Sequence, residues 1–160
     1  MVDAAQPLTI RAATPSDAAL LARHRVAVWL EGGNWTATEL APQVEIWTAF
    51  FEAQLTAATY GAFIAQTSER TLGSGGVLVH AAIPRPGTAS ERAGRIQSLY
   101  VEPAARRAGV ARAIMHRLVA FAREQQLISL ALHPSEQARP LYAALGFKAA
   151  DEMLLRFTRG

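Results

Sequence analysis

The spacing of hydrophobic and polar residues divides the first half of the chain into one strand and two helices. Residues 8–12 alternate apolar and polar side chains, which is typical of a half-buried strand. Thr14 and Pro15 then supply a capping hydroxyl and a first-turn proline, so a helix is predicted over 15–28. A second helix is predicted over 39–55, because aromatic and aliphatic residues recur there at helical spacing.

The second half alternates between strands and helices. Short apolar stretches predict strands at 60–65, 75–82, 95–101, 127–132 and 153–157. An apolar stripe predicts a helix over 109–123, and a further helix is predicted over 135–145, ended by Gly146. Consecutive strands favour antiparallel pairing, whereas the strand, helix and strand over 95–132 require a parallel, right-handed crossover.

These elements predict an α/β fold over 1–160: a single domain with a mixed, mostly antiparallel twisted sheet, one parallel crossover and helices on both faces. A chain of 160 residues suits one core. No apolar stretch approaches the ~18 residues that span a bilayer, and the first residues do not read as a secretory signal, so no membrane association is expected. The lack of cysteine excludes disulfides and Cys-based zinc sites. We expect a cytoplasmic protein without a metal.

Charge narrows the expected ligands. The formal net charge is +3, and every one of the 16 basic side chains except Lys148 is arginine. The arginines are spread along the chain without dense basic runs or interleaved aromatic residues, so the pattern does not favour nucleic acid as a direct ligand. Arg106 and Arg107, however, are adjacent just before a predicted helix, which points to a local anion.

The segment 99–115 has the features of a phosphate-binding loop. A strand runs into Pro103, a short loop follows, and Gly109 opens a long helix. The amides at such a junction are unpaired and converge, and the helix dipole adds positive potential. Gly109 lets an anion approach the backbone without a Cβ in the way, and the arginines around it add positive charge. Those arginines are Arg106, Arg107 and Arg112.

This loop matches neither the P-loop pattern GxxxxGK[ST] nor the dinucleotide fingerprint GxGxxG. Arg106-x-x-Gly109-x-Ala111 instead resembles the [QR]xxGx[GA] signature of the GNAT superfamily of acyl-CoA-dependent N-acyltransferases. The preceding Leu99-x-Val101-x-Pro103 is similar to the strand before that signature. The segment 135–147, with Leu141-Tyr142 and Leu145-Gly146-Phe147, resembles the second signature of the family.

The resemblance implies that acetyl-CoA is the acyl donor and that an amine is the acceptor. In the family, the strand matching 95–101 carries a bulge and splays from its neighbour, and acyl-CoA lies in the cleft. The pantetheine would pair with the main chain of Leu99 and Val101, and the pyrophosphate would rest on the amides of 107–112. The expected cofactor-binding residues are Leu99, Val101, Arg106, Arg107, Ala108, Gly109, Val110, Ala111, Arg112 and Ser135. Arg107 and Ala111 stand where the family often has glycine.

The resemblance also implies direct transfer, in which the amine attacks the thioester and a thiolate leaves. Tyr142 matches the position where the family commonly places a hydroxyl beside the CoA sulfur; the alternative is that its ring only packs against the cleft. Glu102, at the end of a strand, is either a general base or a surface carboxylate. His133 is a second candidate base or a satisfied loop residue. Ser135 either hydrogen-bonds the pantetheine, caps a helix, or does both.

The acceptor is the part of the reaction that the sequence leaves open. The aromatic residues of the first two helices are expected to be mostly core, and only Trp35, beside the Gly32-Gly33-Asn34 break, is expected to line a pocket. His24, His80 and His116 lack metal-ligand spacing and are interpreted as structural. An N-acetyltransferase acting on a small molecule or a protein is the favoured function, and a homodimer is the expected assembly. The alternatives are an inactive acyl-CoA sensor and an enzyme that modifies tRNA or a ribosomal protein.

Overall fold

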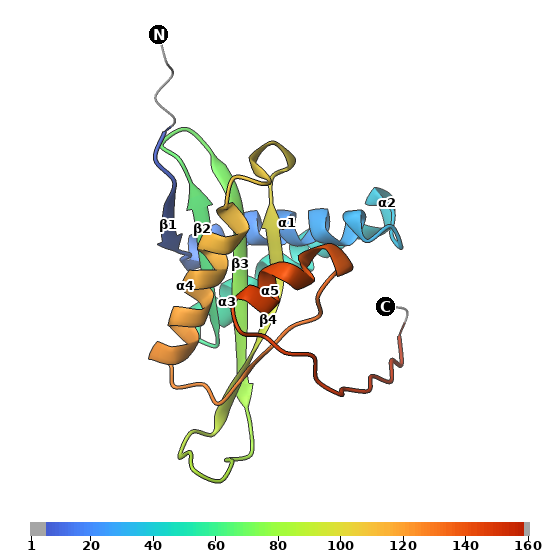
Figure 1. Cartoon of the computed structure of the whole chain (residues 1–160). Coiled ribbons are helices and arrows are strands. Elements are labelled where there is room, and N and C mark those ends of the chain that lie inside the picture. Colours follow the sequence, from blue (N-terminus) through green and yellow to red (C-terminus); the bar gives the residue numbers. More distant parts are fainter. Residues whose placement is uncertain (1–5, 159–160) are drawn as a thin grey trace.

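The computed structural model describes residues 6–158 and contains a five-stranded sheet in the order β1-β2-β3-β4-β5. The first four strands are antiparallel neighbours, and β5 pairs parallel to β4 at the edge of the sheet (Figure 1). The predicted mixed sheet with one parallel crossover is therefore confirmed. The strands are β1 (Thr9–Ala12), β2 (Tyr60–Gln66), β3 (Thr71–Ala81), β4 (Arg92–Val101) and β5 (Leu130–Ala131).

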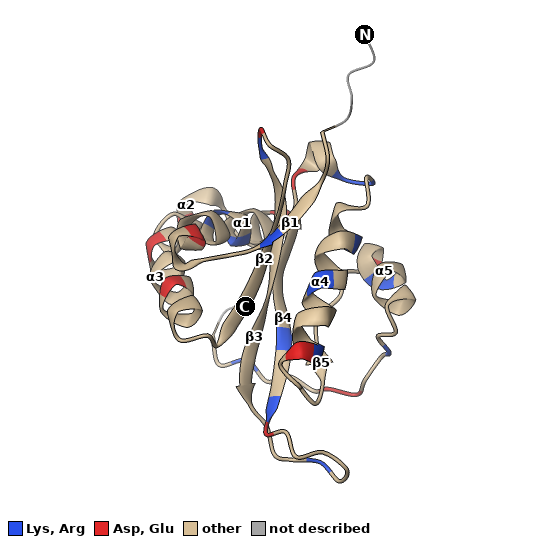
Figure 2. Cartoon of the chain, turned by 90° about the vertical axis from the view of Figure 1, so that its left-hand side faces the viewer, with Lys and Arg blue, Asp and Glu red and all other residues tan. Residues whose placement is uncertain are grey.

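Helices cover both faces of the sheet, as predicted. One face carries α1, α2 and α3, and the other carries α4 and α5 (Figure 2). The bounds are α1 (Ala18–Glu31), α2 (Ala37–Leu40), α3 (Gln43–Thr56), α4 (Val110–Glu124) and α5 (Arg139–Ala144), with 3₁₀ turns at Pro15–Asp17, Pro103–Ala105 and Glu136–Ala138. No helix within 6–158 is both long enough and apolar enough to cross a bilayer.

The alternation of side chains along β2 builds a separate core on each face. Tyr60 and Ala62 point toward α1 and α3, where they pack with Phe51. Phe63 and Ala65 point the other way and join the larger core beneath α4. The sheet is thus buried on both sides, and its loops and strand ends are free to form sites.

The two predicted helices of the N-terminal half differ in detail from the structure. The first begins as a 3₁₀ turn at Pro15–Asp17 and continues as α1 to Glu31. The predicted helix over 39–55 is divided into α2 and α3 at Pro42. Thr36 and Glu39 start α2 with a reciprocal capping box, in which the Thr36 hydroxyl accepts from the Glu39 amide at 3.3 Å.

The predicted strand over 153–157 is wrong, because these residues form no strand. Met153 is 99% exposed and Leu154 is 57% exposed, so neither of the two alternating sets of side chains is buried against the fold. The neighbouring β5 is also shorter than predicted: of 127–132, only Leu130–Ala131 pairs with β4. A strand of two residues offers little edge on which a further strand can form.

Candidate active site

The loop before α4 has the geometry of an anion nest. Gly109 caps α4 with a left-handed backbone (φ 79°) and offers no side chain to the helix end. The first α4 hydrogen bond runs from the Ala113 amide to the Gly109 carbonyl at 3.0 Å, so the amides of the first turn, at 110–112, precede the helical ladder. These amides point out of the helix end with the positive pole of its dipole. A polyanion is the ligand that such an end favours.

The three arginines around the nest have different surroundings. Arg106 donates from Nε to the Val101 carbonyl at 2.9 Å and pairs through Nη2 with Glu31 of α1. Its guanidinium therefore connects the end of β4 to α1. Arg107 and Arg112 make no ion pair with another residue of the described chain, 6–158. Arg107 also has a left-handed backbone (φ 63°) at the position where the resemblance implies glycine.

β4 carries the bulge that the resemblance implies, and its pairing with β5 ends well before its last residue. Opposite Gly75 of β3, two β4 residues, Ser98 and Leu99, fill the space of one, and Ser98 has φ 57°. Pairing of β4 with β5 is confined to Gly94 and Arg95. Beyond Arg95 the outer edge of β4 therefore diverges from β5 and forms one side of a cleft.

The bulge determines which main-chain groups face this cleft. The Glu102 amide donates to Leu72 of β3 at 2.8 Å, so the alternation of the strand directs the amides of Leu99 and Val101 to the opposite side, toward the cleft. The Val101 carbonyl faces the same way and already accepts from Arg106. The main-chain groups that are predicted to contact the pantetheine therefore lie on an accessible edge. Its donors are the amides of Leu99 and Val101, and its acceptor is the Leu99 carbonyl.

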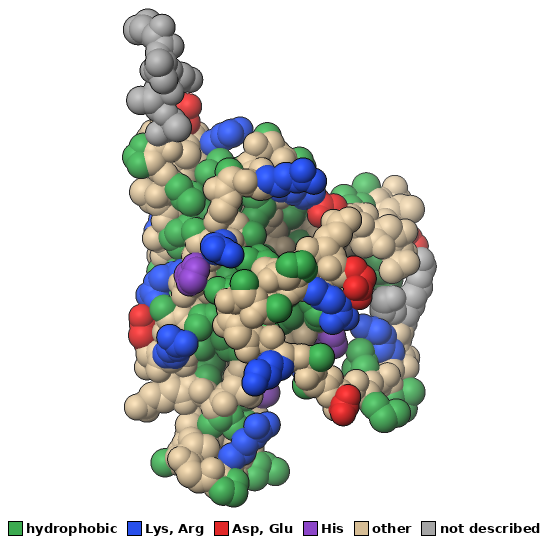
Figure 3. Space-filling view, in the orientation of Figure 1, with side chains coloured by type: hydrophobic (Ala, Val, Ile, Leu, Met, Phe, Trp, Pro, Cys, Tyr) green, Lys and Arg blue, Asp and Glu red, His purple; other side chains and the backbone are tan. Residues whose placement is uncertain are grey.

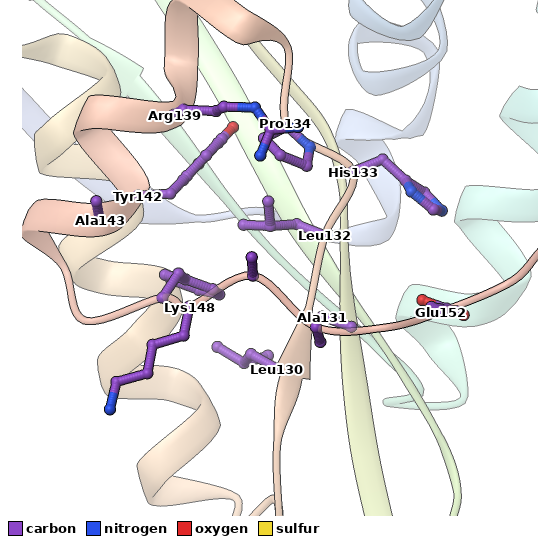
Figure 4. Close-up of a pocket in the computed structure, with 13 residues that line it drawn as sticks. Leu130, Ala131, Leu132, His133, Pro134, Arg139, Tyr142, Ala143, Lys148 and Glu152 are labelled. Atoms are coloured by element: carbon purple, nitrogen blue, oxygen red, sulfur yellow. The ribbon is translucent and has the colours of Figure 1, made fainter.

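Tyr142 lies on α5 and packs into the core on the α4 side of the sheet. Its side chain lines a cavity of about 450 Å³ together with β5 residues, and Figure 4 shows the ring directed from α5 toward the loop of His133 and Pro134. The ring contacts Phe147 edge-on, with centroids 5.9 Å apart. Burial raises the pKa of Tyr142, which keeps its hydroxyl protonated at neutral pH.

His133 and Ser135 lie on the loop between β5 and α5. The His133 Nε2 accepts from Arg95 at 3.1 Å, and Arg95 also binds Glu152 at 2.9 Å. Ser135 occupies the position before the 3₁₀ turn, where its carbonyl accepts from the Arg139 amide at 3.2 Å, but its hydroxyl makes no capping bond. The capping interpretation therefore holds for the backbone of Ser135 and not for its side chain.

Glu102 points to the other face of the sheet, toward α1. Its Oε1 lies 3.8 Å from His24 Nε2, and its Oε2 accepts from the Tyr100 hydroxyl at 3.3 Å. Buried His24 also bonds Ser74 through Nδ1 at 2.7 Å, and burial lowers the pKa of His24. The structure does not bring Glu102 into contact with Tyr142, and the two residues lie on opposite faces of the sheet.

A second cavity, of about 240 Å³, opens on the α1 and α3 face beside the β4 bulge. Gln97 lines it from β4 and Arg25 lines it from α1. The aromatic walls come from Trp47, Phe50 and Phe51, which were expected to be mostly core, and from Tyr60 of β2. Trp35 does not line this cavity and packs edge-on against Trp29. Sequence reasoning missed this site, because its residues come from five separate elements.

The remaining histidines lie on different elements. His80 lies near the end of β3, and His116 is exposed on α4. Within 6–158 there is no group of three or more His, Asp or Glu side chains positioned to hold a metal ion.

Comparison with known proteins gives the same family as the two sequence signatures. The model of the acetyltransferase (GNAT) family matches residues 26–147, which include the anion nest, the β4 bulge and Tyr142. Among curated proteins, glucosamine 6-phosphate N-acetyltransferase of Trypanosoma brucei brucei is 29% identical over 92 residues. That match covers 58% of this chain and spans 60% of the length of the curated relative.

Solved structures reproduce nearly the whole fold. A GCN5-related N-acetyltransferase from Ralstonia eutropha JMP134 has a TM-score of 0.83 and 27% identity, covering 94% of this chain and 99% of its own. A predicted acetyltransferase with acetyl-CoA from Clostridium acetobutylicum has a TM-score of 0.82 and 25% identity, covering 94% and 96%. The cleft beside β4, the nest at α4 and the family match coincide on the same residues. The chain belongs to the acetyltransferase (GNAT) family.

Proposed function

We propose that this protein is an N-acetyltransferase that moves the acetyl group of acetyl-CoA to a primary amine by direct attack in a ternary complex. The observation that carries the proposal is the separation of β4 from β5 after Arg95, which opens a main-chain edge leading to the nest at Gly109. A similar solved structure, that of the Clostridium acetobutylicum protein, is described as containing acetyl-CoA.

The proposed donor site uses backbone groups for most of its contacts. The cleft-facing groups of Leu99 and Val101 would bind the pantetheine, and the amides of 107–112 would bind the pyrophosphate. Arg107 and Arg112 add charge at the nest, and the Ser135 hydroxyl is a further candidate contact for the pantetheine arm. Ala108, Val110 and Ala111 take part through their main chain alone.

The chemistry requires a neutral amine and a stabilised leaving group. The amine nitrogen attacks the thioester carbonyl carbon, a C–N bond forms, the C–S bond breaks, and the nitrogen gives up a proton. Tyr142 is the proposed partner of the leaving sulfur. Because its hydroxyl stays protonated, it donates a hydrogen bond to the developing thiolate.

Glu102 stays a candidate base. Replacing Glu102 with Gln and following the pH profile of kcat/KM tests this: loss of the acidic limb supports a base, and an unchanged profile contradicts it.

The central experiment is Tyr142→Phe with acetyl-CoA and an accepted amine. We expect kcat to fall roughly 10²-fold while the dissociation constant for acetyl-CoA stays the same, because one hydrogen bond to the leaving group is lost and the ring is kept. Unchanged turnover would contradict the role of Tyr142. Thermal stabilisation by acetyl-CoA is the preceding check, since ~100-fold excess over the dissociation constant adds about 2.7 kcal/mol of stability.

An acyl-CoA sensor is the competing function. It would show the same stabilisation by acetyl-CoA but no release of free CoA with any amine, whereas an enzyme releases CoA with at least one. A tyrosine hydroxyl on a cavity wall next to β5 favours the enzyme, because a binding module has no need of a donor beside the leaving sulfur.

Modification of tRNA or of a ribosomal protein would call for a continuous positive surface. Figure 3 shows Lys and Arg side chains dispersed over the displayed face, with Asp and Glu among them. On this displayed face, which carries α4 and α5, the basic side chains do not form one continuous surface.

A homodimer and a cytoplasmic location stay predictions. The exposed apolar segment 153–157 is the surface that we expect a dimer to bury, since Met153 and Phe157 project from the fold. Light scattering of the full chain measures the assembly, and cell fractionation measures the location.

A further inference from the structure

Arg25 is a cation on the wall of a largely apolar cavity. It lies in the middle of α1 and lines the cavity of about 240 Å³ beside the β4 bulge. Its guanidinium carbon is 4.9 Å from the centroid of the Trp47 ring and 5.5 Å from that of Trp29. The remaining walls are Phe50, Phe51 and other uncharged side chains, so Arg25 is the charged lining residue.

The guanidinium has hydrogen-bonding capacity to spare. Nη1 donates to the Ser98 hydroxyl at 2.8 Å, which accounts for one of five N–H donors. Among residues 6–158, no carboxylate lies within 4.0 Å of Arg25: Glu31 pairs with Arg106, and Glu102 points to His24. Burial lowers the pKa of Arg25, as expected of a cation that gives up water without gaining a counter-ion.

Arg25 lies close to the strand segment where the acetyl transfer is proposed to occur. Ser98 is the left-handed residue of the β4 bulge, and Leu99 follows it with its amide in the donor cleft. Gln97, on the other side of Ser98, lines the cavity. A molecule in this cavity therefore places its groups within a residue or two of the strand segment where the thioester is expected.

We propose that the cavity binds the acceptor and that Arg25 holds its carboxylate, so that the substrate is a small amine carrying a carboxylate and an apolar or aromatic side group, as in an apolar α-amino acid. This inference rests on the proposed acetyl transfer and defines its substrate class. The aromatic walls accommodate the side group. The amine projects toward the bulge because it is bonded close to the carboxylate.

The charge count favours a carboxylate over a phosphate. A single guanidinium lines the cavity, and its planar fork matches the two oxygens of a carboxylate. A phosphate ester carries more charge and commonly recruits several cations, whereas the other lining residues here are uncharged. An aminosugar phosphate, the substrate class named for one curated relative, is therefore the contrasting acceptor in the test.

The test compares matched acceptors on the full-length protein. Phenylalanine and leucine are compared with their amides and with phenethylamine, each at a pH that gives the same fraction of neutral amine, and with glucosamine 6-phosphate. We expect the carboxylates to be preferred in kcat/KM by roughly 10- to 100-fold. Preference for the amides or for the sugar phosphate would overturn the proposal while leaving acetyl transfer intact. Absence of stabilisation by acetyl-CoA would instead refute the proposed function.

Variants locate the effect at Arg25. Arg25→Gln should abolish the preference for carboxylates and leave kcat/KM for the amides within about threefold, and Arg25→Lys should restore part of the preference. Arg23→Gln, two residues earlier on the exposed side of α1, is the matched control and should change neither value. Equal losses for carboxylates and amides in Arg25→Gln would overturn the assignment.

A binding measurement covers the case in which Arg25→Gln turns over poorly. Because Trp29 and Trp47 flank Arg25, phenylalanine binding should change tryptophan fluorescence in the presence of CoA, and the variant should lose this response while acetyl-CoA still stabilises it. A retained fluorescence response with unchanged affinity would contradict the proposal.

Discussion

The two walls of the proposed active site are built on different principles. The donor wall, along the outer edge of β4 and the start of α4, presents main-chain amides fixed by unusual backbone angles at Ser98 and Gly109. The acceptor wall, between α1 and α3, presents side chains around Arg25. Backbone contacts depend on conformation and tolerate many residue types, whereas side-chain contacts change with each substitution. The same fold can thus keep one donor and take different acceptors.

The largest effect on acetyl-CoA binding is expected from Gly109→Val. The left-handed backbone at Gly109 aims the amides of the nest, and a β-branched residue disfavours that conformation. We expect the dissociation constant for acetyl-CoA to rise roughly 10- to 100-fold, because several charge-assisted hydrogen bonds weaken together. Calorimetry with acetyl-CoA measures the change.

Gly87→Val is the matched control for this variant. Gly87 has a similar backbone (φ 85°) and, like Gly109, has no neighbouring atom within 4 Å of an added Cβ. Both variants should lose about 1–2 kcal/mol of unfolding free energy, but only the Gly109 variant should lose affinity. If both bind acetyl-CoA as the wild type does, the nest is not the donor site.

Sequence could predict the donor wall because its signals are local. Gly109, the arginines and Pro103 lie within one short segment, and each acts through the backbone next to it. The sequence of the loop therefore contains most of its geometry. One part was not visible: Arg106 is paired with Glu31, a residue 75 positions away, and only the fold brings them together.

The acceptor wall and the end of the sheet could not be predicted in the same way. Trp47 and Phe50 have the helical spacing of core residues, and spacing alone does not tell a buried face from the wall of a cavity. The segment 153–157 has the composition of a strand, but pairing depends on a partner edge, and β5 offers only two residues. The cavity wall and the missing strand both depend on contacts between distant segments.

A smaller effect, confined to the acceptor face, is expected from Asp17→Asn. Arg11 of β1 donates two hydrogen bonds to Asp17 at 2.8 Å, and the Thr14 amide donates a third, which fixes the chain where it enters α1. These bonds, chiefly that from Arg11, lower the pKa of Asp17 to about 2. The variant should lose about 1–2 kcal/mol of unfolding free energy at neutral pH, after allowance for solvent screening.

The pH dependence of this loss has a definite sign. A carboxylate with a lowered pKa stabilises the folded state above its unfolded value of 3.8, and the contribution declines as the pH falls toward 2. The stability gap between wild type and Asp17→Asn should therefore close between these values in denaturant titrations. Acetyl-CoA affinity at neutral pH should not change, and a weakened affinity would show that the two walls are coupled.

The smallest effects are expected from two variants of Arg107, which separate the contribution of the backbone at the donor wall from that of the arginine charge. Arg107 has a left-handed backbone (φ 63°), which costs a non-glycine residue about 1 kcal/mol, so Arg107→Gly should raise the unfolding free energy by about 0.5–1 kcal/mol. Arg107→Asn removes the same charge but keeps a side chain that tolerates this conformation. Thermal unfolding and acetyl-CoA calorimetry are measured for both.

If amides supply most of the binding, both Arg107 variants should bind acetyl-CoA within about threefold of the wild type, because the loss of one exposed charge costs under about 1 kcal/mol. A loss of tenfold or more in both would show that the arginine charge, and not the backbone, governs the site. A loss in Arg107→Gly alone would show that the side chain at this position holds the nest in shape. In either case the donor wall would depend on side chains as the acceptor wall does, and the contrast between the two would fail.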